Sequence, residues 1–215
     1  FPVPVFLQDD ANACAVAEWK YGAGRGTRNM IFLTFGTGMG AGLILDGRLY
    51  SGTNDNAGEC GHIRLEPYGP VGYGKAGSME GFCSGGGIAR LARMRLLELS
   101  QCGRSVSWAP EPEQVNAKLV AEAAGRGDAL ALEIYRESAR HLGKGVAILM
   151  DLLNPACIVL GRVFARSERL FREEMERVIR EEALPLTRSV CRIVPAGLGE
   201  RIGDIACLAI AGGLE

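Results

Sequence analysis

Two acids and an amide lie close together near the start of the chain, in the segment Asp9-Asp10-Ala11-Asn12. A short apolar run precedes them and a stretch with helical spacing follows. We therefore expect a strand-to-helix junction, where α/β proteins commonly present ligand-binding groups. Acids at a helix start are also ordinary capping residues. Both interpretations can hold, because an ionised carboxylate at such a position can accept a proton from a bound hydroxyl group.

A glycine-rich segment follows the next apolar run and reads Gly36-Thr37-Gly38-Met39-Gly40-Ala41-Gly42. Glycines let the backbone approach a phosphate group, and the hydroxyl group of Thr37 could bind the same ligand. The segment lacks the Gly-Lys-Ser/Thr ending of a P-loop, and we expect a hairpin rather than a helix after it, so the dinucleotide-binding fingerprint does not match. The glycines could equally serve a twisted or bulged strand junction.

A carboxylate and an imidazole lie three residues apart in Gly58-Glu59-Cys60-Gly61-His62, and Glu80 follows further along the chain. The glycines predict a shaped loop, and its polar side chains suit recognition of a polyol. A single Glu or His in such a loop is otherwise a surface residue or a local hydrogen-bond partner. His62 with Cys60 and Cys83 could suggest a metal site, but the chain has no Cys-x-x-Cys pair, so a zinc ion would lack ligands.

The composition argues against several classes of function. Of 215 residues, 47% are hydrophobic and 23% are charged, and the formal net charge is −1. This balance gives no basic field for binding nucleic acid. No apolar run has the length of a membrane span. The seven cysteines lack paired spacing, which is typical of a reducing compartment, and we therefore expect a cytoplasmic protein.

The elements that must position these residues alternate in class along the chain. Asp46-Gly47 is a strong hairpin turn signal, and residues 51–87 are expected to form a long functional loop. Expected strands are 3–7, 30–35, 43–45, 48–50, 156–160 and 189–194, and expected helices are 11–21, 88–99, 113–124, 128–153, 167–182 and 203–211. This alternation indicates a layered α/β fold in one compact domain.

Together and in this order, the motifs closely resemble the ROK family (repressors, open reading frames and kinases). Residues 155–161 and 194–196 also resemble the later strands of that family. The resemblance implies an α/β, actin-like ATPase (ribonuclease H-like) fold with a mixed sheet flanked by helices. It implies that residues 1–215 form the large, sugar-binding C-terminal domain. The family's N-terminal small domain, with its Asp-x-Gly-Gly-Thr phosphate loop, has no counterpart in these residues.

The resemblance also implies roles for individual residues in ATP-dependent phosphorylation of a hexose or an N-acetylhexosamine. Asp10 matches the catalytic base, and Mg²⁺ would bridge the phosphates of ATP. The positions that match sugar-binding residues are Asp9, Asn12, Glu59, His62 and Glu80. The positions that match the phosphate-facing turn are Gly36, Thr37, Gly38 and Gly40.

The chain departs from the family pattern at the zinc motif, where Val71, Tyr73 and Ser78 stand at cysteine positions, so we predict no zinc. Asp9 stands where the family usually has Asn. Two alternatives to a kinase remain: a sugar-sensing transcriptional regulator with its DNA-binding segment elsewhere, or a catalytically degenerate sugar-binding domain. The resemblance implies a homodimer, to which the helix at 128–153 offers apolar surface, although that surface could equally face the chain's own core.

Overall fold

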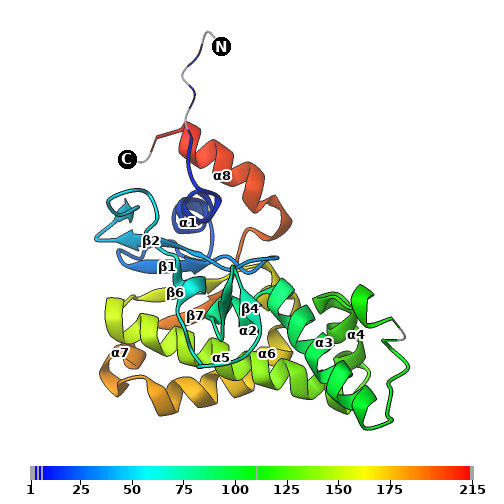
Figure 1. The fold of residues 1–215 in the computed structure, drawn as a ribbon. Coiled ribbons are helices and arrows are strands. Elements are labelled where there is room, and N and C mark those ends of the chain that lie inside the picture. Colours follow the sequence, from blue (N-terminus) through cyan, green and yellow to red (C-terminus); the bar gives the residue numbers. More distant parts are fainter. Residues whose placement is uncertain (1–2, 4, 6, 110, 214–215) are drawn as a thin grey trace.

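The computed structural model describes residues 3, 5, 7–109 and 111–213 (Figure 1). A five-stranded sheet in the order β3-β2-β1-β6-β7 lies at its centre. The first three strands are antiparallel neighbours, whereas β6 and β7 run parallel to β1, which makes the sheet mixed. These strands are β1 (Met30–Leu33), β2 (Ala41–Leu45), β3 (Arg48–Tyr50), β6 (Cys157–Leu160) and β7 (Arg192–Pro195).

Helices cover both faces of the sheet (Figure 1). One face carries α1 (Asp10–Tyr21) and α8 (Ile202–Ala211). The other helices lie beyond the opposite face: α2 (Met79–Cys83), α3 (Gly85–Gln101), α4 (Ala117–Gly125), α5 (Ala129–Leu153), α6 (Arg162–Glu182) and α7 (Pro185–Val190). A small hairpin and three 3₁₀ turns complete the described elements: β4 (Val71–Gly72), β5 (Lys75–Ala76), η1 (Cys60–His62), η2 (Pro112–Gln114) and η3 (Gly199–Arg201).

The central strand β1 separates two hydrophobic cores. Its side chains alternate, so Ile31 and Leu33 pack into the larger core with α5, and Met30 and Phe32 pack into the smaller core with α1 and α8. All four residues are buried, which is typical of a strand with helices on both faces. The α/β class with a mixed sheet is therefore confirmed.

The predicted hairpin at Asp46-Gly47 is also confirmed. The two residues have φ angles of 52° and 75°, and a two-residue hairpin turn of this kind requires positive φ at both positions. Most buried residues of α5 belong to the larger core, so the chain itself covers much of the apolar surface of that helix. Among the described residues, no helix is both long and apolar enough to cross a membrane.

Several expected boundaries were wrong. Part of the strand expected at 3–7 lies outside the described residues, and Val3, Val5 and Leu7 are exposed and belong to no strand. The loop expected at 51–87 contains the β4–β5 hairpin and α2.

Three further elements in the second half of the chain begin at other residues than expected. The helix expected from 113 begins at 117, where the Asn116 side chain caps it by accepting from the Leu119 N–H. The strand expected from 189 begins at 192, because residues 185–190 form α7. The helix expected from 167 begins at 162 and continues through a kink at Ser167.

Candidate functional site

The side chain of Asp9 caps helix α1. Its Oδ1 accepts hydrogen bonds from the backbone N–H of Ala11 at 3.0 Å and of Asn12 at 3.1 Å, which satisfies two donors that a helix start leaves open. Asp10 is the first helical residue, and its side chain is exposed. The cap thus presents the Asp10 carboxylate at the start of α1 without using it in the fold.

The glycine loop, residues 34–40, connects β1 to β2 and is held at several points. The Thr34 N–H donates to the Gly40 carbonyl at 2.9 Å, and the Gly40 N–H donates to Thr34 Oγ1 at 3.0 Å. Glu80 Oε2 accepts from the Met39 N–H at 3.1 Å. Because these bonds fix both ends of the loop, Gly36, Thr37 and Gly38 stay exposed between them in one defined path.

A cavity of about 450 Å³, here called the acid pocket, lies between this loop and the start of α1. Four carboxylates line it, from Asp9, Asp10, Asp55 and Glu59. Its other polar wall is formed by the glycine loop, including Thr34, Gly36, Thr37, Gly38 and Gly40. The fold therefore brings three predicted acids and all four predicted phosphate-loop residues to one cavity. Sequence reasoning missed Asp55, which has no motif spacing to distinguish it.

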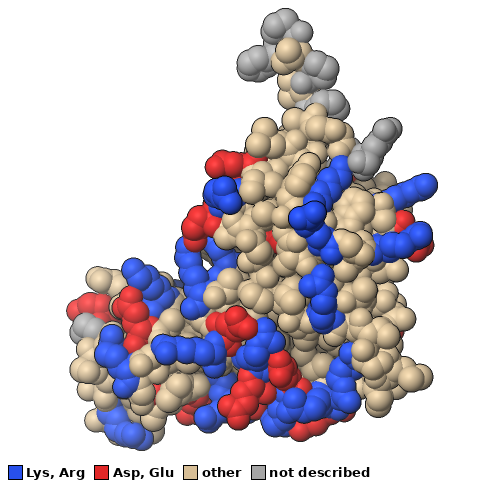
Figure 2. Space-filling view, turned by 180° about the vertical axis from the view of Figure 1, so that it is seen from behind, with Lys and Arg blue, Asp and Glu red and all other residues tan. Residues whose placement is uncertain are grey.

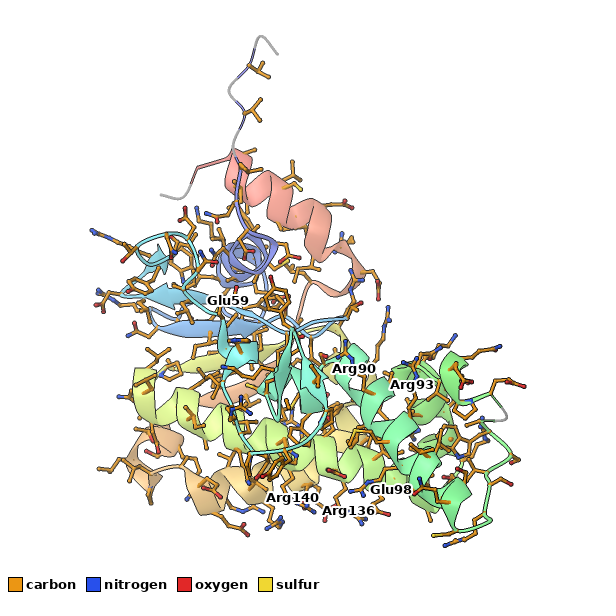
Figure 3. The ribbon with its side chains drawn as sticks, in the orientation of Figure 1. Glu59, Arg90, Arg93, Glu98, Arg136 and Arg140 are labelled. Carbon is orange, nitrogen blue, oxygen red and sulfur yellow. The ribbon has the colours of Figure 1, made fainter. Side chains whose placement is uncertain are left out.

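Glu59 reaches the acid pocket because its turn packs directly on β2. The Ala41 N–H donates to the Gly58 carbonyl at 2.7 Å. Gly58 has φ +100°, and a Cβ there would lie 1.9 Å from the Ala41 carbonyl oxygen. Only glycine fits this approach. Glu59 lies beside the sheet, well apart from Arg90 and Arg93 on α3 (Figure 3).

Three of the predicted sugar-binding residues do not line the acid pocket. Asn12 is buried, and its Nδ2 donates to Gln8 Oε1 at 3.3 Å while its Oδ1 has no hydrogen-bond partner. Glu80 supports the glycine loop from behind through Met39. His62 is exposed and makes an edge contact with the ring of Tyr73, the two ring centres being 6.3 Å apart.

The residues at the zinc-motif positions serve the fold instead. Val71 lies in β4, Tyr73 is exposed, and the Ser78 hydroxyl caps α2 by accepting from the Gly81 N–H at 3.1 Å. Within the described part of the chain, no group of three or more His, Cys, Asp or Glu side chains could hold a metal ion. Absence of zinc stays a prediction.

The seven cysteines are unpaired, and they differ in exposure. Cys60, Cys83 and Cys157 are buried, Cys14 and Cys191 are half-buried, and Cys102 and Cys207 are exposed. Burial raises the pKa of the Cys60 thiol to about 12. That thiol is therefore protonated near neutral pH and is a poor metal ligand or nucleophile.

A larger cavity of about 1110 Å³, here called the arginine cleft, lies on the other side of the glycine loop and shares Gly36 and Thr37 with the acid pocket. Its cationic lining residues are Arg93, Lys118, Arg126, Arg162, Arg166 and Arg169, against the single acid Glu122. Figure 2 shows Lys and Arg side chains around the hollow between the α3–α4 lobe, at lower left, and the main body. Apolar side chains of Ala89, Val115, Ala121, Tyr135 and Leu170 also line the cleft.

A third cavity of about 420 Å³ lies beside the other two. Asp10 and Gly36 line it together with Arg162 from the start of α6. Asp10 therefore borders both the acid pocket and a cavity that shares Gly36 and Arg162 with the arginine cleft. The arrangement places an exposed carboxylate between an acid-lined site suited to hydroxyl groups and a cation-lined site suited to phosphates.

An antiparallel three-stranded unit followed by two parallel strands, with helices on both faces and cavities on the two sides of the β1–β2 loop, is the arrangement of an actin-like ATPase domain. Residues 1–212 match the family model described as the ROK family, and the chain belongs to this family. The solved structures agree. A ROK family glucokinase from Streptomyces griseus, in complex with glucose and AMPPNP, superposes with a TM-score of 0.83 at 29% identity, covering 97% of this chain and 68% of that one.

The relatives include both enzymes and regulators. The chain is 34% identical over 205 residues to a glucokinase of Halalkalibacterium halodurans, covering 94% of this chain and 62% of that protein. It is 33% identical over 202 residues to the DNA-binding transcriptional dual regulator NagC of Escherichia coli, covering 94% of this chain and 48% of that protein. The chain thus spans between about half and two thirds of the length of these two relatives.

Proposed function

We propose that this chain is the large, sugar-binding domain of an ATP-dependent sugar kinase whose acceptor is a hexose or an N-acetylhexosamine. The observation that carries the proposal is the position of Asp10, which borders the acid pocket and also a cavity next to the arginine cleft. The glucokinase relatives support the same class of activity.

In this mechanism the carboxylates of the acid pocket accept hydrogen bonds from sugar hydroxyl groups. Asp10 takes the proton from one hydroxyl group as its oxygen attacks the γ-phosphorus of ATP. A new O–P bond forms, the bond to the β–γ bridging oxygen breaks, and ADP leaves. Such transfer depends mainly on positioning and charge stabilisation. The fixed glycine loop between the two cavities supplies the positioning.

The glycine loop and Asp10 are also suited to bind ATP together with its Mg²⁺ ion. Gly36, Thr37 and Gly38 are exposed, and Gly36 and Thr37 line the arginine cleft, where the phosphates would pass. Mg²⁺ usually binds through substrate phosphates, water and one or two carboxylates, rather than in an all-protein cage. Asp10 would be the carboxylate of this chain closest to that role, since it lines both cavities that meet at Gly36. When bound, the ion neutralises charge on the phosphates.

The test is ADP release by the complete gene product over a panel of hexoses and N-acetylhexosamines. The Asp10→Asn variant should lose at least about a hundredfold in kcat, because general base catalysis typically contributes two to four orders of magnitude. Asp46→Asn is the matched control, since Asp46 lies in the β2–β3 turn at positive φ, a conformation that Asn also tolerates. Full activity of Asp10→Asn, or no ADP release by the wild type with any sugar, would refute the kinase.

A sugar-sensing regulator is the second candidate, and the 33% identity to NagC favours it. A regulator would keep the acid pocket without needing Asp10 as a base. Calorimetry that detects sugar binding while the complete gene product releases no ADP would support the regulator. Absence of both signals would support a degenerate domain.

A further inference from the structure

Three arginines form a row along the cleft-facing side of α6. Arg162 and Arg166 are spaced i and i+4, which places them on one face of the helix, and Arg169 follows beyond the kink at Ser167. All three line the arginine cleft. At a rise of 1.5 Å per residue, the row extends about 10 Å along the helix.

Two members of this row, Arg162 and Arg169, form no ion pair in the described part of the chain, although the charge of Arg162 helps Arg166 to lower the pKa of Glu200. Among the described residues, the side chains of Arg162 and Arg169 make no hydrogen bond or ion pair, as is also true of the side chain of Arg126, the residue that caps the end of α4. Arg166 pairs with Glu200, with Nη2 to Oε1 at 2.5 Å. Of the residues that the structure describes, Glu122 is the only acid that lines the cleft, and its Oε1 lies 3.9 Å from Lys118 Nζ. The cavity therefore carries a local excess of positive charge, although the whole chain has a formal net charge of −1.

The backbone at the start of α6 adds to this field. No acid lies in the first turn, and the cap residue Gly161 has no side chain to bind the open N–H groups. A cation at a helix start opposes the helix dipole, and a bound anion would relieve both. Arg162 and Arg166 both line the cavity that Asp10 and Gly36 also line. Arg162 is the first residue of α6, so the row runs from that cavity into the arginine cleft.

We propose that the arginine row of α6 binds the phosphate chain of the phosphoryl donor, with Arg162 nearest the phosphate to be transferred. A planar guanidinium group can bind a phosphate through two parallel hydrogen bonds. The phosphate chain can belong to a nucleoside triphosphate or to inorganic polyphosphate. The cleft is also lined by the apolar side chains of Ala89, Ala121 and Leu170, which offer a surface for a nucleobase. Of the two sources, only the nucleotide has a nucleobase. That the bound phosphate chain belongs to a phosphoryl donor rests on the proposed kinase function, whereas the binding of a phosphate chain does not.

The experiment is calorimetric titration of the 215-residue chain, without sugar, with two probes: inorganic tripolyphosphate and ATP. Arg162→Ala/Arg169→Ala should weaken binding of the probe by at least about tenfold, because each arginine supplies charge-assisted hydrogen bonds. Arg136→Ala is the matched control, since the Arg136 side chain is also exposed and has no ion-pair partner among the described residues, but lies on α5 outside the cleft lining. The double lysine variant should recover only part of the affinity, because lysine keeps the charge and loses the two-bond geometry.

Binding of either probe that weakens in the double alanine variant supports the proposal. Which of the two probes binds then identifies the source of the phosphate chain. Failure of both probes to bind the wild type overturns it, as does equal weakening in Arg136→Ala or unchanged affinity in the double variant. If circular dichroism shows that Arg162→Ala/Arg169→Ala does not fold, the double lysine variant is the test. Wild-type affinity in the double lysine variant would overturn the bidentate contact. No turnover is measured, so the arginine row and the catalytic role of Asp10 can fail separately.

Discussion

The two sides of the glycine loop differ in charge and in size. The acid pocket is lined by four carboxylates in about 450 Å³, whereas the arginine cleft is lined by six cations in about 1110 Å³. Gly36 and Thr37 belong to both. Such a division keeps hydroxyl-binding acids away from a phosphate chain that they would repel, and it brings the two ligands together only at the loop.

The two sides also differ in how they are built. Backbone approaches shape the acid pocket: a Cβ on Gly61 would lie 2.0 Å from the Met39 carbonyl oxygen, and one on Gly42 would lie 2.5 Å from that of Ala11. Long side chains on α3, α4 and α6 shape the arginine cleft. The acid pocket should therefore be sensitive to single added atoms, whereas the cleft should tolerate substitution with loss of ligand affinity only.

The largest effect is expected for Gly58→Ala. The substitution combines a φ of +100° with a backbone contact of 1.9 Å, and we expect the free energy of unfolding to fall by about 3 kcal/mol or more. Denaturant unfolding measures the loss. Gly74→Ala is the control, because Gly74 also has positive φ, +76°, but nothing lies within 4 Å of its added Cβ. Equal losses in the two variants would show that the close approach to β2 is unimportant.

A smaller effect is expected for Glu80→Ala, which removes the acceptor of the Met39 N–H. Because the glycine loop is shared, both sugar binding and ATP binding should weaken by about tenfold, the usual consequence of losing one charge-assisted hydrogen bond. Calorimetry with each ligand separates two roles of Glu80. If Glu80 instead binds sugar directly, only the sugar affinity falls. Glu80→Gln keeps an acceptor oxygen and should retain most of both affinities.

The smallest effect is a pH dependence of stability that arises where α5 packs on α2. The His141 ring stacks on Phe82 of α2 with ring centres 3.6 Å apart, and its Nε2 lies 3.4 Å from Glu66 Oε1. Burial lowers the pKa of His141 below its ordinary value of 6.5, with Lys144 acting in the same direction, while Glu66 and Glu137 oppose this shift. The unfolded chain therefore takes up the proton more readily, and stability should decrease as the pH falls below 6.5.

Thermal unfolding between about pH 8 and pH 5.5, the range in which histidine titrates, tests this expectation. The chain contains two histidines, so His141→Gln should flatten the dependence and His62→Gln should leave it in place. A flat profile in the wild type, or the opposite result for the two variants, would contradict the assignment to His141.

Local signals predicted the parts of the fold that depend on neighbours in the chain. Asp46-Gly47 predicted its hairpin because positive φ at both positions is a property of those residues. The apolar runs at 30–35 and 156–160 predicted two central strands, which are observed at 30–33 and 157–160. The start of α6 was missed, since the kink at Ser167 and the absence of a side-chain cap at Gly161 remove the usual signals. With the start placed at 167, Arg162 and Arg166 were not visible as one face of a helix.

The sequence by itself determined the fold class and the family, because ordered motifs and apolar periodicity are written in neighbouring residues. It also identified Asp9, Asp10, Glu59 and the glycine loop as candidates, which the fold brings to one cavity. Only the tertiary structure decided that Glu80 supports the loop, that Asp55 joins the acid pocket, and that arginines from α3, α4 and α6 meet around one cleft. Net charge sums over the whole chain, whereas a binding field depends on which side chains folding brings together.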